Sequence, residues 1–349
     1  MTKFQKQMMT IAAIGALSAV TALPAMAADV SFYGQARLAT FYNMIDDDNG
    51  DSTSGFDEHF QPNSRFGANF KNGDFGGKVE IGFGSSINST ALSTRLLYGS
   101  WNFGSGKLLV GQDYNRYWVG SAQVHGDDLG FTGYGATDDK RSPQIRVDMN
   151  NGFYFAAIQP KQNVNNGNQE TVSGGNESYL PKLNVGYAGK AGNFSYNAGL
   201  VGQFYKDKNN DEQVTALLGY LSGKYAMGAT SVLFNLSYAQ NPAEMNFQGR
   251  TAKSATDDMR GFEGFLQLSQ TLSPTLGLNA GVGYVYDKSE ASGADADDKM
   301  SVFVNMPIKL AKFVTLTPEI SYYDQLSEVG ATDSDAKNWA VGAKWQIDF

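Results

Sequence analysis

The sequence predicts an all-β fold, a transmembrane antiparallel β-barrel of sixteen strands, and three observations carry that prediction. Apolar residues alternate with polar residues or glycine along segments of roughly 10–14 residues, which are longer than most strands of soluble sheets. The connections between these segments alternate between short turns and long polar loops. The composition, with 40 Gly and 13% aromatic residues, suits tight turns and strands.

Charge and composition exclude several classes of protein. The formal net charge of −8 argues against a nucleic-acid-binding protein, which would carry a basic stripe. The absence of Cys excludes disulfide scaffolds and Cys-ligated metal centres, and there are only two His. Beyond the N-terminus no apolar run reaches about 18 residues, so the sequence predicts no membrane-spanning helix. We therefore expect neither a cofactor nor a metal ion.

Residues 1–27 have the pattern of a secretory signal. A basic start (Lys3, Lys6) precedes a short Ala-rich apolar stretch, which ends in the small-x-small cleavage motif Ala25-Met26-Ala27. A membrane anchor is disfavoured because the apolar stretch is short and a cleavage motif follows it. We expect Sec-type export, removal of the signal, and one barrel domain over residues 28–349.

Alternation with period 2 identifies the strands. It is clearest in the segments 30–42, 194–204, 276–286, 300–310 and 339–349. The second face of these segments is polar or glycine, whereas the interior of a soluble sandwich must be apolar. Apolar residues outside and polar residues inside are typical of a transmembrane barrel.

Two kinds of connection set the strand number. Seven short turns lie at 72–74, 104–106, 150–152, 190–193, 226–228, 273–274 and 311–312. Eight longer polar loops lie at 44–62, 85–93, 112–140, 160–178, 206–212, 241–259, 287–299 and 326–337. Together they predict sixteen strands with both termini on the turn side, which we expect to face the periplasm. The segments 85–103 and 213–225 do not alternate cleanly.

The last strand carries a short signal of its own. Trp345, Ile347 and the terminal Phe349 share one face of an alternating segment. A C-terminal aromatic residue in this setting resembles the outer-membrane assembly signal. We therefore expect these three residues to be read by the barrel-assembly machinery.

The acidic segment 47–58 has part of the spacing of a calcium loop. Asp47, Asn49, Asp51 and Glu58 stand at the first, third, fifth and twelfth positions of such a loop. The position that requires glycine holds Ser52, and no helices are predicted beside it. A solvated acidic loop is the favoured interpretation, and calcium binding stays the alternative.

Five arginines belong to the early strands. They are Arg37, Arg65, Arg95, Arg141 and Arg146. An arginine on the lipid face of a barrel costs roughly 2–4 kcal/mol at the midplane, so we expect these side chains in the lumen or near its rim. The long loop 112–140 between them carries carboxylates, among them Asp113, Asp127 and Asp128.

These features together resemble the trimeric general porins of Gram-negative outer membranes. The segments that carry the resemblance are 30–37 (Val-Ser-Phe-Tyr-Gly-Gln-Ala-Arg), 64–71 (Ser-Arg-Phe-Gly-Ala-Asn-Phe-Lys), 94–98 (Thr-Arg-Leu-Leu-Tyr), 106–111 (Gly-Lys-Leu-Leu-Val-Gly) and 345–349 (Trp-Gln-Ile-Asp-Phe). These motifs cover mainly the first third of the mature chain and its last strand, while the organisation matches throughout.

The resemblance implies a constriction loop folded into the lumen and facing a basic wall. Arg65 and Arg95 match wall arginines of the family in their local context, and either Arg141 or Arg146 matches a third. Asp127 and Asp128 would be the loop carboxylates, although His125-Gly-Asp-Asp-Leu-Gly130 replaces the usual Pro-Glu-Phe-Gly-Gly segment.

The resemblance also implies function and partners. It implies passive diffusion of small hydrophilic solutes through a homotrimer embedded among outer-membrane lipid and lipopolysaccharide. Three alternatives stay open: a substrate-specific porin with an aromatic track (inward Tyr33, Phe41, Tyr205 and Phe303), an outer-membrane enzyme, and an adhesin barrel. An enzyme is disfavoured because neither His59 nor His125 sits in a recognisable Ser/His pattern. Acidic outer loops predict a mild cation preference at low salt.

Overall fold

The computed structural model describes residues 29–46, 52–86, 89–126, 131, 134–137, 139–160, 162–164, 168–170, 176–207, 211–245, 257–327 and 337–349. Several predictions fall outside the described residues. They are the signal segment 1–27, three ligand positions of the possible calcium loop (Asp47, Asn49 and Asp51), and the loop carboxylates Asp127 and Asp128.

The first half of the barrel contains eight full strands and a small separate hairpin. The elements are β1 (Asp29–Asp46), β2 (Ser52–Phe60), β3 (Arg65–Asn72), β4 (Phe75–Ser86), β5 (Ser89–Asn102), β6 (Gly106–Tyr114), β7 (Arg141–Met149), β8 (Phe153–Ile158), β9 (Gln162–Val164), β10 (Asn168–Glu170), β11 (Asn176–Ser178) and β12 (Lys182–Ala191). Strands β9 and β10 pair only with each other.

The second half continues the meander to the C-terminus. Its elements are β13 (Phe194–Asp207), β14 (Glu212–Met227), β15 (Thr230–Gln240), the short 3-10 helix η1 (Pro242–Met245), β16 (Met259–Ser273), β17 (Leu276–Ser289), β18 (Ala296–Asn305), β19 (Ile308–Ala311), β20 (Val314–Ser327) and β21 (Lys337–Asp348). No helix in the described part of the chain is long and apolar enough to cross a membrane.

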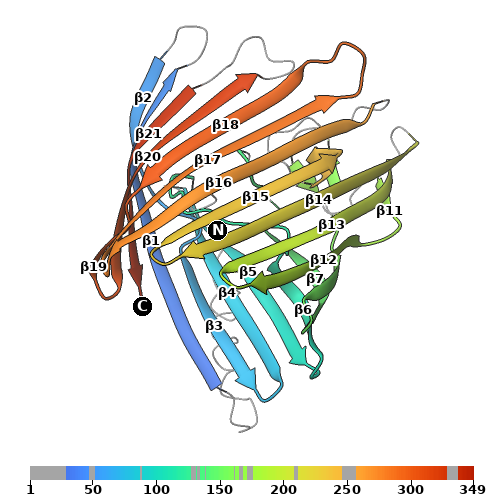
Figure 1. The fold of residues 1–349 in the computed structure, drawn as a ribbon, viewed down its shortest axis with the longest axis horizontal. Coiled ribbons are helices and arrows are strands. Elements are labelled where there is room, and N and C mark those ends of the chain that lie inside the picture. The colour runs from blue at the N-terminus through green and yellow to red at the C-terminus, as the bar shows by residue number, and fades with distance from the viewer. Residues whose placement is uncertain are drawn as a thin grey trace, which may run out of the picture.

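The sheet closes on itself as an antiparallel barrel, so the predicted fold class is confirmed. The last strand β21 pairs with β1 from Gln35↔Asp348 to Asp46↔Lys337, and the red C-terminal strands lie beside the blue N-terminal strand in Figure 1. Three strands are each interrupted once, which splits them into β2 and β3, β11 and β12, and β18 and β19. The nineteen segments of the main sheet therefore make sixteen strands, as the sequence predicts.

The barrel carries apolar side chains on its outer surface and polar side chains in its interior, the reverse of a soluble protein. Ile347 and Leu200 are 51% and 63% exposed on the outer surface, while Glu263 and Asn184 are fully buried inside. A closed barrel satisfies all backbone hydrogen bonds between strands and leaves no sheet edge, so its apolar surface can face lipid. Apolar and polar residues thus alternate in the sequence because successive side chains point to the lipid face and to the lumen face of the wall.

Three predicted loops are shorter than expected, because paired strands extend beyond the membrane-sized segments. The connection predicted at 44–62 is largely strand, since β1 and β2 pair from Leu38↔Phe60 to Asp46↔Ser52. Likewise β4 and β5 pair out to Ser86↔Ser89, and β17 and β18 pair out to Lys288↔Ala296. Backbone pairing needs no apolar side chains. The polar ends of these hairpins are therefore strand, although they lack the apolar alternation from which the strands were predicted.

Candidate functional site

The described residues of the loop between β6 and β7 (115–126, 131, 134–137 and 139–140) fold into the lumen and lie along the wall from β8 to β1. Its described residues contact side chains of β14, β16, β18 and β20 and reach Asn43 on β1. The loop is thus inside the barrel, as the resemblance implies, and it leaves the wall of β3 to β7 facing it.

One carboxylate holds the far end of the loop. Glu319 on β20 accepts hydrogen bonds from the backbone N–H groups of Val124 (2.6 Å) and His125 (2.7 Å). Asn305 and Ser321 also donate to the same carboxylate, at 2.8 Å and 2.7 Å. Glu319 is only 2% exposed, and these four donors satisfy its buried oxygens.

Two side chains of the loop add to this anchor. The amide of Gln123 contacts the hydroxyls of Ser301, Ser321 and Tyr323 at 3.0–3.2 Å and accepts from the Phe131 N–H. The ring of His125 lies 2.7 Å from the Tyr323 hydroxyl and 3.1 Å from Asn43 Oδ1. His125 therefore serves as a loop anchor in this structure.

Glycines on the wall allow the loop backbone to approach closely. A Cβ atom on Gly283 would lie 2.0 Å from the Tyr134 carbonyl oxygen, well inside contact distance. Beside it, Phe131 packs on Phe265 and Phe303 with ring centroids 5.1 Å and 5.4 Å apart. The loop thus covers Phe303, and His125 covers Phe41 at 4.9 Å, so two of the four aromatic track candidates are not free.

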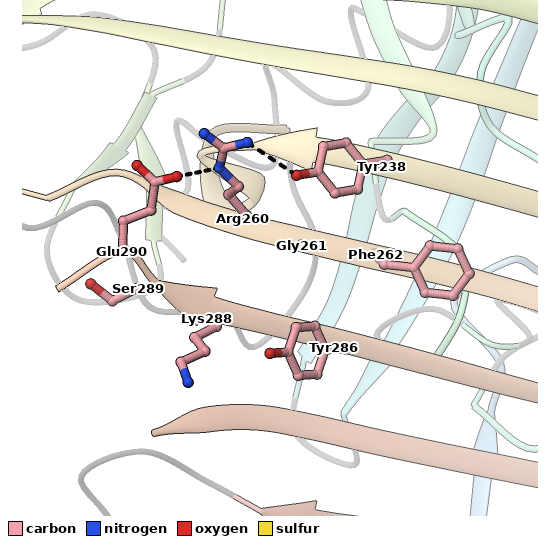
Figure 2. Close-up of a pocket in the computed structure, with 8 residues that line it drawn as sticks. All are labelled: Tyr238, Arg260, Gly261, Phe262, Tyr286, Lys288, Ser289 and Glu290. Atoms are coloured by element: carbon pink, nitrogen blue, oxygen red, sulfur yellow. Dashed lines mark hydrogen bonds and ion pairs between the residues drawn. The ribbon is translucent and has the colours of Figure 1, made fainter. Parts of the chain in front are cut away.

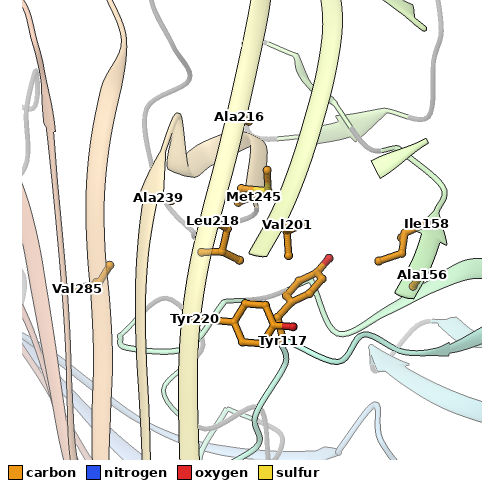
Figure 3. Close-up of a cluster of buried hydrophobic side chains, with 10 residues drawn as sticks. All are labelled: Tyr117, Ala156, Ile158, Val201, Ala216, Leu218, Tyr220, Ala239, Met245 and Val285. Carbon is orange, nitrogen blue, oxygen red and sulfur yellow. The ribbon is translucent and has the colours of Figure 1, made fainter. Parts of the chain in front are cut away.

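A buried cluster holds the base of the loop. Tyr117 packs against β8, β13 and β14, with its ring 6.0 Å from that of Tyr220 (Figure 3). Its hydroxyl donates to Asp139, which also pairs with Lys182 at 2.9 Å. Asp139 and Lys182 are at most 1% exposed, and a charge so buried requires its partner.

The opposite wall carries the predicted arginines around Glu80, a carboxylate that was not predicted as part of the site. Arg95 Nε lies 2.7 Å from Glu80 Oε1, and Arg65 Nη1 lies 3.6 Å from the same oxygen. The Tyr33 hydroxyl donates to the other oxygen at 2.7 Å. Glu80 is 1% exposed, so it fixes both guanidinium groups in place. Its place between Val79 and Ile81 in an alternating strand was the signal for an inward carboxylate.

A second ion-pair group lies one strand further along. Arg146 contacts Asp113 at 2.8 Å and Asp148 at 3.0 Å, and the loop residue Arg116 shares Asp148 at 2.5 Å. Asp113 was expected on the loop opposite the arginines. It lies instead in β6, because β6 continues to Tyr114, and it pairs with Arg146 on the same wall.

The remaining two arginines lie at the edges of this network. Arg141 opens β7, and its guanidinium lies 5.7 Å from the ring centroid of Tyr114, whose hydroxyl accepts from Arg95 at 3.2 Å. Arg37 on β1 is 8% exposed and donates to Gln35 at 2.9 Å. Four arginines (Arg65, Arg95, Arg116 and Arg146) thus make ion pairs with three carboxylates (Glu80, Asp113 and Asp148), so these paired groups carry one net positive charge.

The C-terminal residues close the barrel. Phe349 exchanges two backbone hydrogen bonds with Gly34, at 2.6 Å and 3.0 Å, beyond the last residue of β21. Trp345, Ile347 and Phe349 all face outward, at 44%, 51% and 69% exposure. Their recognition during assembly remains a prediction.

Comparisons with known proteins identify the architecture. No protein-family model matches the sequence, and no protein of curated function matches it. Among solved structures, the outer membrane channel DcaP of Acinetobacter baumannii is similar, with a TM-score of 0.77 at 19% identity over 93% of this chain and 99% of that chain.

Two further structures extend the comparison. The anion-selective porin from Comamonas acidovorans has a TM-score of 0.61 at 14% identity, over 92% of this chain and 100% of that one. OmpT of Vibrio cholerae, an outer membrane protein, has a TM-score of 0.57 at 18% identity, over 93% and 99%. At these identities the likeness shows the fold, and this chain is a barrel of the architecture found in outer-membrane channels and porins.

Proposed function

We propose that this protein is an outer-membrane porin, a water-filled channel for passive diffusion of small hydrophilic solutes and ions. The observation that carries the proposal is a sixteen-stranded lumen narrowed by an anchored loop that faces a wall of arginines. A barrel of this strand number is too wide for wall side chains alone to fill, so an aqueous path remains. Transport requires no chemical step, and we expect no enzymatic activity.

The charges of the narrow region define how solutes are selected. Positive groups on one side of a wet constriction order water and penalise apolar solutes, which must displace it. The excess of arginine over carboxylate attracts anions into the narrowest part. The similar fold of an anion-selective porin supports this assignment of charge preference.

The proposal includes the cellular context. We place the mature chain in the outer membrane after export, with lipopolysaccharide and lipid around it and the long loops outside. We also propose a homotrimer, the form in which one structure of Vibrio cholerae OmpT was solved. A monomer in native mass spectrometry from mild detergent would refute the trimer.

A planar-bilayer recording tests the function. We expect a large, linear conductance that does not saturate with solute and that appears in three equal steps for a trimer. Saturation by one solute would instead indicate a substrate-specific porin. Absence of conductance from folded, inserted protein would overturn the channel and favour an enzyme or adhesin barrel.

A further inference from the structure

The turn end of the lumen is lined by lysines. Five of them alternate along their strands with residues that face the lumen, so their side chains point inward as well. They are Lys71 (β3), Lys78 (β4), Lys107 (β6), Lys190 (β12) and Lys224 (β14). Lys190 and Lys224 are both register partners of Ser195 on β13, so the three residues form one row across the wall.

The lysines leave this end of the lumen positive. None of the five makes an ion pair in the part of the chain that the structure describes, and Lys78 lies 4.9 Å from the ring centroid of Tyr33. The carboxylates described at the same end are Asp29, Asp74, Asp148 and Asp348. Asp148 is already paired with Arg116 and Arg146, so the five lysines outnumber the other three carboxylates.

The loop end of the lumen has the opposite charge. Asp287 on β17 and Asp297 on β18 are register partners, and both side chains are buried in the lumen, as is Glu263 on β16. Lys299, two positions from Asp297, offsets one of these three charges. The formal net charge of the chain is −8, so a positive turn end and a positive arginine wall leave a larger negative excess at the loop end.

We propose that this separation of charge makes the channel rectify, with more current when the loop side is positive than when the turn side is, and that the turn-end lysines set this direction. The inference rests on the proposed function, which makes the lumen an open path for ions. Acidic residues around a pore enrich cations, and basic residues enrich anions. A positive loop side drives both enriched ions towards the middle of the channel, where they accumulate. The opposite voltage draws both away from the middle and lowers the current.

The salt concentration decides when rectification is visible. In 1 M KCl the screening length is about 3 Å, so the field of the lysines does not reach across the lumen and the current is linear with voltage. In 0.05 M KCl the screening length exceeds about 10 Å, and the field of the lysines extends into the open path. Rectification should therefore appear at low salt and vanish at high salt.

Single-channel currents in 0.05 M KCl, in channels of known orientation, test the proposal. Because the chain has no cysteine, biotin can be attached to Asn193→Cys alone, at the turn between β12 and β13. Streptavidin is too large to cross the lumen, so it perturbs the current only from the turn side. At about 100 mV we expect the wild-type current with the loop side positive to exceed the reverse current at least about 1.5-fold.

The charge of two lysines can be removed and restored in the same channel. Lys190→Cys with Lys224→Cys should bring the ratio of the two currents towards 1. The two cysteines lie two strands apart, about 10 Å, which is too far for a disulfide. A methanethiosulfonate that attaches an ammonium group should restore the ratio, and one that attaches a sulfonate should lower it further.

The matched control places the same changes on the outer face of the barrel. Lys288 is exposed beside Tyr286 there (Figure 2), and the Lys312 amine lies 4.8 Å from the ring centroid of the exposed Phe313. Lys288→Cys with Lys312→Cys removes the same charge outside the lumen. This variant should rectify as the wild type does before and after either reagent.

The outcomes separate this inference from the channel itself. Equal currents at both polarities in conducting wild-type channels, or a larger current with the loop side negative, would overturn the rectification and leave the channel standing. Wild-type rectification in Lys190→Cys with Lys224→Cys, unchanged by both reagents, would overturn the role of the lysines. Folded, inserted protein that carries no current at any voltage would refute the channel and this inference with it.

Discussion

At the scale of the residue, Glu80 sets the charge of the arginine wall. It lies within ion-pair distance of Arg65 and Arg95 and is almost completely buried, so it is ionised among cations and cancels one of them. The buried Glu80 carboxylate also holds Arg65 and Arg95 in place. Moving either guanidinium away would leave a buried charge without its partner, which is energetically costly.

We predict that Glu80→Gln makes the channel more anion-selective. The variant keeps the shape of the side chain and removes one negative charge from the narrow region. Reversal potentials across a KCl gradient measure the change. Tyr33→Phe is the matched control, because it removes a hydrogen bond to the same carboxylate without changing charge. Equal reversal potentials in Glu80→Gln and wild type would show that the carboxylate lies outside the ion path.

His125 links the loop to pH. Burial lowers the pKa of His125 from its ordinary value near 6.5 to about 4, and the nearby His59 contributes. An undocked loop returns this imidazole towards 6.5, so the undocked state binds more protons between those values. The contribution of neutral His125 to the docking free energy of the loop is therefore complete above about pH 6.5. Up to roughly 3 kcal/mol of it is lost as the pH falls towards 4.

We accordingly predict more current fluctuation at pH 4–5 than at pH 7 in single-channel recordings. His125→Gln should reduce that difference, because an amide can still contact Tyr323 and Asn43 but does not titrate. The other titratable groups facing this position are Glu319, Tyr323, His59 and Asp57. A variant with the full pH response of the wild type would assign the effect to one of those groups, with Glu319 the first candidate.

At the scale of the element, the loop docks where β17 has no side chain. We predict that Gly283→Ala displaces the loop, because the new Cβ would lie 2.0 Å from the Tyr134 carbonyl oxygen. The single-channel conductance should change, and the melting temperature of the folded barrel should fall. Gly277→Ala on the same strand is the control, since its nearest neighbours would be 3.6 Å away. Similar behaviour of the two variants would argue against this docking contact.

Two segments that alternate poorly have structural reasons that sequence alone did not supply. On β14, Leu218 and Tyr220 are buried in the lumen under the loop while Leu217 and Leu221 face outward, so both faces are apolar. On β5, a bulge at Arg95 shifts the register against β4, and Arg95 and its neighbour Leu96 are both buried. On the outer side, Gln112 donates to the Thr94 and Arg95 carbonyls at this bulge.

The C-terminal strand carries an assembly prediction. Deletion of Phe349 should lower the amount of folded, inserted barrel while export continues, because the residue completes the pairing of the last strand with Gly34 and is the predicted assembly signal. Heat-modifiable mobility of outer-membrane fractions measures the effect. Phe349→Tyr keeps both the backbone pairing and an aromatic ring and should assemble normally. Wild-type levels of the deletion variant would remove Phe349 from the signal.

At the scale of the whole molecule, the strand number was predictable and the charge partners were not. Alternation and turn spacing are local properties of the chain, and they gave sixteen strands. Val124 lies 195 residues before Glu319, and Lys182 lies 43 residues after Asp139, and no local pattern encodes such a meeting. The lumen arginines were predictable because lipid excludes them, whereas Asp113 was assigned to the wrong side, since strand pairing extends beyond the apolar segment.

The acidic mouth and the arginine wall of the lumen favour opposite ions, and the salt concentration decides which of them dominates. Acidic residues crowd the loop end of the barrel, and we expect them to enrich cations at the wide mouth. That field fades above about 0.1 M salt, where the screening length is near 10 Å. The arginine network in the lumen is partly buried and is screened less, so its excess positive charge should dominate as salt rises.

We therefore predict that the permeability ratio of chloride to potassium increases with salt. Arg65→Ala with Arg95→Ala should remove this rise and enlarge the single-channel conductance, since two side chains leave the narrow region. Lys309→Ala with Lys312→Ala removes the same charge at the turn end and should leave the ratio unchanged. Reversal potentials at 0.05 M and 1 M KCl measure both effects. A ratio that falls with salt in the wild type would mean that the wall is neutralised by carboxylates, with Asp127 and Asp128 the first to substitute.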